Sequence, residues 1–287
     1  MTSGIGSKRI GVVCSGLLAA TVSLPALAQA PAQGLLDNKF VFSLGGFAVG
    51  SDVKARLDGS STTNPDVDFD ETFGRDSDAT RIRLDALWRI TPAHQLRLMY
   101  FDKSSKNSRV IDRDIKWGDY TFNVGGLVEA ERSFKTTALA YEWAFMRRPS
   151  YEVAASFGVH YTDLSLQLSG NATLTDANGN PIGSAVATVR QTSLPAPLPV
   201  IGLRGGWVLA PQWYLDADAR FFKLKVDGYD GNWSDLGVNA TWMFHPNFGV
   251  GAGYNRFVTR VDVSRDNFDG RLSFGYSGLR LFLTGTF

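Results

Sequence analysis

The residues with the clearest capacity for chemistry are the histidines and a short acidic run. His160 is the best candidate for a general base, because Asp163 and Ser165 follow it closely, and a hydroxyl, an imidazole and a carboxylate together can activate a nucleophile. In an extended strand, however, His160 points to the face opposite both residues. We therefore expect no enzyme and a structural role for this histidine, and keep an envelope enzyme centred on His160 as a weak alternative. The other two histidines lie in proline-containing turns and are interpreted as turn residues.

The acidic run Asp66-Val67-Asp68-Phe69-Asp70-Glu71 places carboxylates at alternate positions, as at the start of a calcium loop. An EF-hand needs glycine at the sixth position and glutamate at the twelfth, where this chain has Glu71 and Ser77. We interpret the run as a solvated loop. The sequence predicts no cofactor and no metal, with Asp66, Asp68 and Asp70 as a weak metal candidate.

The first thirty residues have the layout of an export signal. Lys8 and Arg9 precede an apolar stretch over 10–24, and Ala28-Gln29-Ala30 supplies the small residues of a cleavage site. Fifteen apolar residues are fewer than the about 20 that a membrane helix needs. The sequence therefore predicts a cleaved signal peptide over 1–30, a short periplasmic segment over 31–38 and one domain over 39–287, without a disulfide because the single cysteine, Cys14, lies in the signal.

Charge argues against a nucleic-acid partner. Removal of the signal takes Lys8 and Arg9 and no acidic residue, so the mature chain carries 27 basic and 28 acidic side chains, a net charge of −1. Nucleic-acid-binding domains are usually strongly basic. We therefore expect no nucleic-acid partner.

Alternation of apolar and polar residues dominates the rest of the chain and predicts β-strands. One face of each strand carries bulky apolar groups, and the other carries charges, glycine and small polar residues. Short proline-containing turns alternate with longer polar connections, as in barrels with tight periplasmic turns and long outer loops. The predicted strands cover 39–57, 79–91, 95–106, 126–146, 151–171, 185–209, 212–226, 232–244, 248–264 and 271–287. The fold class is therefore all-β, a transmembrane antiparallel up-and-down β-barrel of about ten strands.

Tryptophans supply an independent test of this map. Five of the seven lie within a few residues of a predicted short turn and share the parity of the apolar face. Outer-membrane barrels carry such aromatic girdles at the lipid interfaces. The predicted girdle consists of Trp88, Trp143, Trp207, Trp213 and Trp242.

The residues between the apolar positions of each strand point to the other face and predict what fills the lumen. Charges of both signs fall there, and isolated charges in a tight interior are costly, so they are expected to pair. A ten-stranded barrel is only slightly wider than the eight-stranded kind that side chains fill. We expect a narrow, largely filled lumen with a network of Arg83, Asp85, Glu142, Glu152, His160, Arg204, Asp216, Asp218, Arg220 and Arg280.

The segment Pro195-Ala196-Pro197-Leu198-Pro199 is unusual inside a strand. Prolines two residues apart remove N–H donors from the same side of a ladder. One hypothesis is a lateral gap at Pro195, Pro197 and Pro199 that admits small apolar molecules. The alternative is that these prolines lie above the membrane, where an unpaired edge is harmless.

Taken together, the signal, the alternating strands, the girdle and the terminal aromatic Phe287 resemble bacterial outer-membrane β-barrel proteins as a class. The resemblance covers nearly all of the mature chain. It implies a bacterial outer-membrane location in a Gram-negative envelope, with outer-membrane lipids, lipopolysaccharide, periplasmic chaperones and the outer-membrane assembly machinery as partners. It also implies that Leu281, Leu283 and Phe287 form the assembly signal, although Gly285 departs from the usual bulky residue. Basic residues near the outer strand ends are candidate counter-ions for lipopolysaccharide phosphates: Lys54, Arg56, Lys103, Lys106, Lys223 and Lys225.

The functional expectation is a structural or surface-interaction role for five extracellular loops on a barrel with a narrow charged lumen. The first alternative is transport, through a porin-like narrow channel or a lateral conduit for small apolar molecules. The second is the enzyme at His160. The sequence leaves the ligand and the oligomeric state open.

Overall fold

The computed structural model describes residues 31–59, 63–74, 81–176, 178, 180–192, 196–226, 228–265 and 268–287. The predicted signal peptide and Pro195 therefore lie outside the described residues. Ten long strands form the barrel: β1 (Phe40–Leu57), β3 (Ile82–Arg89), β4 (His94–Val110), β7 (Leu127–Arg148), β8 (Tyr151–Thr175), β10 (Ala196–Ala210), β11 (Trp213–Val226), β12 (Tyr229–His245), β13 (Phe248–Arg265) and β14 (Phe268–Thr286).

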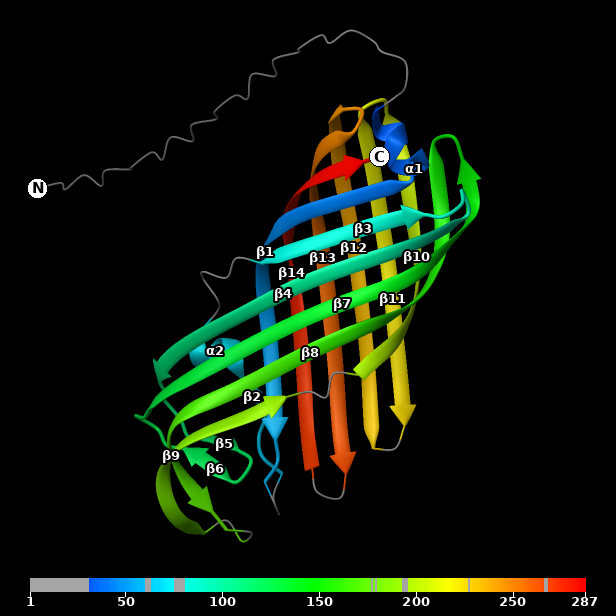
Figure 1. Ribbon diagram of the computed structural model, residues 1–287. Helices are drawn as coiled ribbons and strands as arrows, with labels where there is room; N and C mark the ends of the chain where they lie inside the picture. Colours follow the sequence, from blue (N-terminus) through cyan, green and yellow to red (C-terminus); the bar gives the residue numbers. More distant parts are fainter. Residues whose placement is uncertain are drawn as a thin grey trace, which may run out of the picture.

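These ten strands close into an antiparallel ring, as the sequence predicts (Figure 1). Neighbours in the chain pair with one another around most of the ring. Closure comes from β1 and β14, which pair from Val41↔Thr286 to Leu57↔Gly270, and from β8 and β10. The predicted strand over 185–209 is divided in the structure between β9 (Pro181–Thr192) and β10, and only β10 belongs to the ring.

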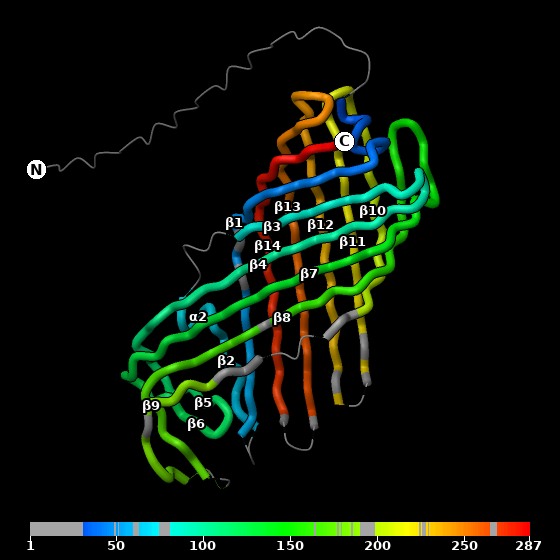
Figure 2. The backbone as a smooth tube through the Cα atoms, viewed as in Figure 1, coloured from blue at the N-terminus to red at the C-terminus, as the bar shows by residue number. Residues whose placement is uncertain are grey.

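The two ends of the barrel differ. At one end, which we call the turn end, the strands are joined by short turns at 90–93, 149–150, 211–212 and 246–247, and the described chain begins and ends there. The smooth backbone trace shows β4, β7 and β8 slanting away from β11–β14 toward the opposite end, which we call the loop end (Figure 2).

The loop end carries small elements that the alternation did not predict. They are β2 (Val67–Asp68), α2 (Phe69–Phe73), β5 (Ile115–Trp117) and β6 (Tyr120–Phe122). Asp68 begins α2, because its side chain accepts hydrogen bonds from the backbone N–H groups of Asp70 and Glu71. Phe69 and Phe73 then pack into the interior, with Phe69 edge-on against Trp117. We call β9, the hairpin of β5 and β6, and the outer halves of β7 and β8 the outer extension.

Outward side chains around the ring form an apolar belt. On β8 the outward positions from Tyr151 to Tyr161 are apolar or small, and Asp163 is the first outward polar residue. These eleven residues match the about 9–11 that a tilted strand needs to cross a bilayer. The belt contains the exposed side chains of Phe42, Leu44, Leu84, Leu98, Leu139, Phe157, Val159, Tyr161, Ile201, Leu203, Phe221, Leu236, Val238, Val250, Tyr254, Leu279, Leu281 and Leu283.

Neither α-helix in the described residues has the length and hydropathy that a membrane-crossing helix requires.

Candidate functional site

The barrel interior near the turn end is filled by paired charges, which we call the ionic layer. Glu142 accepts hydrogen bonds from Arg97 Nε at 2.8 Å and Arg204 Nε at 2.9 Å. Glu152 accepts from Arg204 at 2.5 Å and from Arg89 at 3.4 Å. Each residue comes from a different strand, so these contacts connect β3, β4, β7, β8 and β10, which are consecutive neighbours on one side of the ring.

A second part of the ionic layer lies across the lumen. Asp85 pairs with Arg83 on its own strand and with Arg280 of β14 at 2.5 Å. Arg220 reaches Asp218 at 3.3 Å and Asp235 at 3.7 Å. The remaining members are the amides Gln95, Asn239 and Asn255, which bond to Glu152, Asp216 and Asp235 respectively. The structure thus brings together the residues that the sequence assigned to the lumen, apart from His160.

Space inside the ionic layer is small. A cavity of about 70 Å³ is lined by parts of Asp85, Arg97, Arg204, Asp216 and Arg280. That volume holds a few water molecules. Glycines make room for the large neighbours: a Cβ atom on Gly206 or Gly251 would collide with the ring of Tyr214 or Phe282, respectively.

The turn end is closed by residues 31–38, which we call the plug segment. It consists of η1 (Pro31–Gln33) and α1 (Gly34–Asp37), followed by Asn38. Leu35 and Leu36 are buried, in a cluster with Tyr214 and Met243 from the barrel wall. The sequence predicted a short periplasmic segment here but no helix and no burial, since eight residues show no usable periodicity.

Two arginines and a threonine hold the plug segment by its carbonyl groups. Arg147 donates to the Leu36 carbonyl and to Asp37 Oδ1, both at 2.6 Å. Arg89 donates to the Asn38 carbonyl at 2.8 Å, and the Thr286 hydroxyl donates to the Gly34 carbonyl at 3.0 Å. The plug segment is therefore fastened to β3, β7 and β14 at once.

We expect Arg147→Ala to loosen the plug segment. Hydrogen bonds from a charged donor contribute about 1.5–3 kcal/mol each, so amide exchange over residues 31–38 should rise by at least about tenfold. Hydrogen–deuterium exchange with mass spectrometry of the protein in detergent measures this. Arg148→Ala is the matched control, because the side chain of Arg148 bonds only to the neighbouring Arg147 carbonyl among the described contacts. Equal exchange in both variants would contradict the role of Arg147.

Beyond the ionic layer, toward the loop end, aromatic rings fill the lumen. Phe134 stacks on Phe274 with ring centres 4.6 Å apart, and Phe257 stacks on Tyr276 at 4.9 Å. We call this set the aromatic layer: Phe47, Phe101, Phe134, Trp233, Phe257, Phe274 and Tyr276. The sequence analysis missed it, although Phe101 has the same parity as Arg97, Phe134 the same as Glu142, and Phe274 and Tyr276 the same as Arg280.

His160 lies between the two layers. Its ring is buried and meets Trp233 edge-on, with centres 4.4 Å apart. Within the described part of the chain its imidazole makes no hydrogen bond to a hydroxyl or a carboxylate, and Asp163 and Ser165 lie on the opposite face of β8. This arrangement counts against a catalytic His160, because a general base needs a nucleophile within hydrogen-bond reach.

The three aspartates of the acidic run have separate partners. Asp66 lies near Arg56 and Arg271, Asp68 caps α2 and pairs with Lys54, and Asp70 accepts from Arg132 at 2.8 Å. Burial raises the pKa of Asp70, and Arg132 offsets this only in part. Burial opposes ionisation of Asp68 as well, but the Glu71 N–H and Lys54 lower its pKa below the usual range. No three metal-ligating side chains converge among the described residues.

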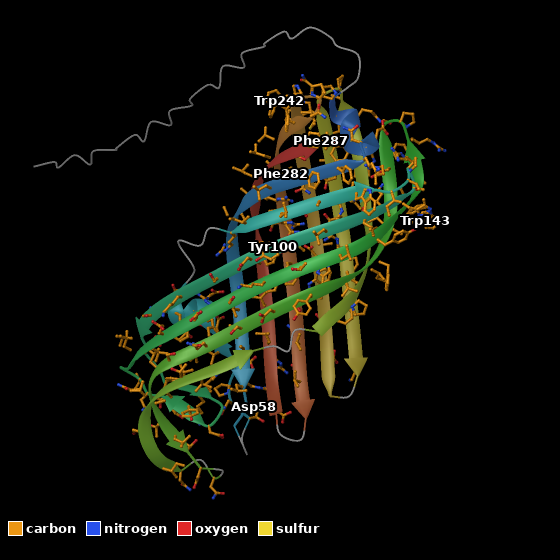
Figure 3. All side chains as sticks on the ribbon, viewed as in Figure 1. Asp58, Tyr100, Trp143, Trp242, Phe282 and Phe287 are labelled. Atoms are coloured by element: carbon orange, nitrogen blue, oxygen red, sulfur yellow. The ribbon has the colours of Figure 1, made fainter. Side chains whose placement is uncertain are left out.

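The predicted girdle residues Trp88, Trp143, Trp213 and Trp242 are exposed on the outer surface, whereas Trp207 is half-buried. Trp143, Trp242 and Phe287 lie toward the turn end, and Asp58 lies at the loop end (Figure 3). Of the predicted assembly signal, Leu281, Leu283 and Phe287 are all exposed on the outer surface.

One of the predicted lipopolysaccharide contacts has a different location. Lys103 was expected on the outside, but its side chain is buried in the lumen, 6.0 Å from the ring centre of Phe274. The reason is parity, because Lys103 shares the inward face of β4 with Arg97 and Phe101. Lys106, Lys223 and Lys225 are exposed.

The ladder around Pro197 and Pro199 is one-sided. β10 pairs with β8 from Ala196↔Thr162 onward, but its pairing with β11 begins only at Ile201↔Phe221. Val159 and Tyr161, opposite the two prolines, are the last residues of the apolar belt on β8. The interruption therefore lies at the outer limit of the belt.

Comparisons with known proteins place this geometry in a class. No family model matches the sequence, and no curated protein compared with it matches. Among solved structures, the outer membrane protease OmpT from Escherichia coli is similar, with a TM-score of 0.55 and 14% identity over 91% of this chain and 99% of that one. The toluene transporter TodX of Pseudomonas putida aligns with a TM-score of 0.37 and 9% identity, over 91% of this chain and 93% of that one. The Yersinia pestis attachment invasion locus protein Ail aligns at 0.29 and 9%, over 86% and 99%.

The fold is that of the bacterial outer-membrane β-barrel proteins, the class that the sequence resembles. At 14% identity the similarity to OmpT defines the fold and not the activity. The particular form in this chain is a closed ring of ten strands with a filled interior and a plug segment at the turn end.

Proposed function

We propose that this protein is a non-conducting outer-membrane barrel whose outer extension acts as an interaction surface. One observation carries the proposal: the plug segment, the ionic layer and the aromatic layer fill the lumen in succession, while β7 and β8 continue well beyond the apolar belt. The turn end faces the periplasm, and residues 1–30 direct export and are removed. Lipopolysaccharide phosphates lie beside exposed lysines such as Lys106 and Lys223.

Conductance and surface access test the proposal together. In planar bilayers the purified protein should give no stepwise conductance, even as the Arg147→Ala variant, because two filled layers remain behind the plug segment. Trypsin added to intact cells should cut at Arg113, which is exposed just before β5 at the loop end, and spare Lys39, which is exposed at the turn end. Stepwise conductance of the wild-type protein would favour the narrow channel instead. Cleavage at Lys39 alone would mean that the turn end, and not the loop end, faces the cell exterior.

A second candidate, the lateral conduit, is favoured by the one-sided ladder. Val200 and Phe222 lie just beyond the last pair, Ile201↔Phe221, and both side chains pack at the aromatic layer. An apolar molecule from the outer leaflet would meet these side chains first. Filled interior space argues against free passage, so we rank this function below the surface role.

A disulfide staple that joins β10 to β11 at the interrupted ladder tests the lateral conduit. Pro199 and Lys223 are the next outward-facing residues beyond the last pair, and both are exposed. A disulfide in the Pro199→Cys, Lys223→Cys double variant should lower entry of the apolar dye N-phenylnaphthylamine into cells if the opening is used, and reduction should restore it. Equal dye entry with and without the staple would eliminate the conduit.

A further inference from the structure

The outer extension has a free strand edge. β9 pairs with β8 from Ser165↔Thr192 to Thr175↔Pro181, and β8 uses its other edge for β7 and β6. No strand in the described part of the chain pairs with the far edge of β9. Every second residue of β9 therefore presents its backbone N–H and C=O groups away from the sheet.

The free edge follows from the different lengths of the strands. β8 runs for 25 residues, whereas β11 runs for 14, and the ladder between β10 and β11 ends at Ile201↔Phe221. β8 and β9 also slant away from β11 beyond that point (Figure 1). No barrel strand is therefore available to cover β9.

This edge lacks the usual protection against pairing. Exposed edges are normally short, charged, bulged or interrupted by proline. β9 has twelve residues with one charge, Arg190, and its proline and its register shift, at Ile182, lie within its first two residues, so the ladder from Gly183 to Thr192 is regular. Its outward side chains include Val186, which is 81% exposed, and Ile182, which is 62% exposed.

Lipid does not cover these side chains. Val186 pairs with Asn171 of β8, ten residues beyond Tyr161, where the apolar belt ends. At about 3.3 Å per residue this is about 33 Å along the strand. The opposite face is already packed, because Ala187 is buried and Val189 contacts the interior cluster.

We propose that the free edge of β9 binds an extended segment of a partner protein by β-strand addition. Unpaired main-chain groups along twelve residues specify an extended polypeptide as the occupant, because lipids and small solutes cannot supply a matching ladder. The added strand places apolar side chains beside Val186 and Ile182 on its outer face. This proposal rests on the surface role given above and names the kind of partner.

The probe is a synthetic peptide with the sequence of Ser165–Thr175, the segment that β9 accepts within the fold. Fluorescence anisotropy with the full-length protein in detergent should show saturable binding. Two further peptides carry N-methyl groups at the odd or at the even positions. An antiparallel strand uses alternate residues toward one neighbour, so one methylated peptide should lose at least about tenfold in affinity while the other binds. No binding, or equal effects of both methylation patterns, would overturn the proposal.

Matched variants of the protein complete the test. Val186→Lys places a charge at the edge and should weaken peptide binding by at least about tenfold. Leu127→Lys changes a side chain on the same outer face that is 63% exposed, but on β7, two strands away, and should leave binding unchanged. Equal losses in both variants would indicate general apolar adhesion. A wild-type dimer that Val186→Lys dissociates would make the occupant a second copy and overturn the partner-protein proposal.

Different results would contradict the surface role and the strand-addition proposal. Conductance in bilayers contradicts the non-conducting surface role whatever the peptide does. Absence of peptide binding to a protein that is silent in bilayers contradicts strand addition alone.

Discussion

Replacing Glu142 by alanine should lower the free energy of unfolding by about 3–5 kcal/mol, because the buried Arg204 and the half-buried Arg97 would lose their shared carboxylate. Breaking a buried ion pair by removing one partner leaves an uncompensated charge in a place where water cannot reach it freely. Guanidinium-induced unfolding in detergent, followed by tryptophan fluorescence, measures the loss.

Glu129 on the same strand is the matched control. It pairs with Lys106 at 2.8 Å, the same distance as Glu142 to Arg97, but both side chains of this pair are accessible to solvent. Exposed pairs contribute little, so Glu129→Ala should leave the unfolding midpoint unchanged. Similar shifts for the two alanine variants would show that the ionic layer does not stabilise the barrel through burial. Glu142→Gln, which keeps the shape, should fall between them.

Phe134→Ala should have an effect of similar size through a different cause. Phe134 is buried against Phe274, Phe257 and several other rings, and truncating a buried phenylalanine costs about 3–5 kcal/mol through lost contacts and a residual cavity. The same unfolding measurement applies. Conductance should stay absent in this variant, because the ionic layer remains intact.

Phe157→Ala separates cavity formation from simple loss of apolar surface. Phe157 is 60% exposed in the apolar belt, so its removal leaves no cavity, and lipid or detergent fills the space. Its effect should be clearly smaller than that of Phe134→Ala. A larger effect for Phe157 would mean that the aromatic layer is loosely packed.

Much of the fold was predictable from alternation because a strand has a period of two residues. Parity alone assigns Glu142 and Arg204 to the lumen and Leu139 and Leu203 to the belt. The partners of each charge were not predictable, because they depend on register between strands far apart in sequence. Glu142 and Arg204 illustrate this, since they meet inside the lumen from β7 and β10, the two neighbours of β8.

Three features escaped the sequence analysis for physical reasons. The aromatic layer could have been predicted from alternation, because Phe134 lies eight residues before Glu142 on the same face of its strand. It was missed because only the charged residues of that face were assigned to the lumen. The plug segment is too short for a periodic signal, and the arginines that hold it, Arg89 and Arg147, come from barrel strands distant in sequence. The division of the strand over 185–209 into β9 and β10 falls where the pairing with β8 is interrupted, between Ser165↔Thr192 and Thr162↔Ala196, and alternation within one strand does not reveal such an interruption.

The fastening of Gly34 by Thr286 has a consequence for biogenesis. These residues are 252 positions apart, so the segment before the first barrel strand is held by a residue of β14. Contacts between such distant positions form late, after the intervening chain has been ordered. The plug segment can therefore be fastened only after β14 has paired with β1, so protection of the amides of residues 31–38 against hydrogen exchange measures the fraction of molecules with a closed barrel.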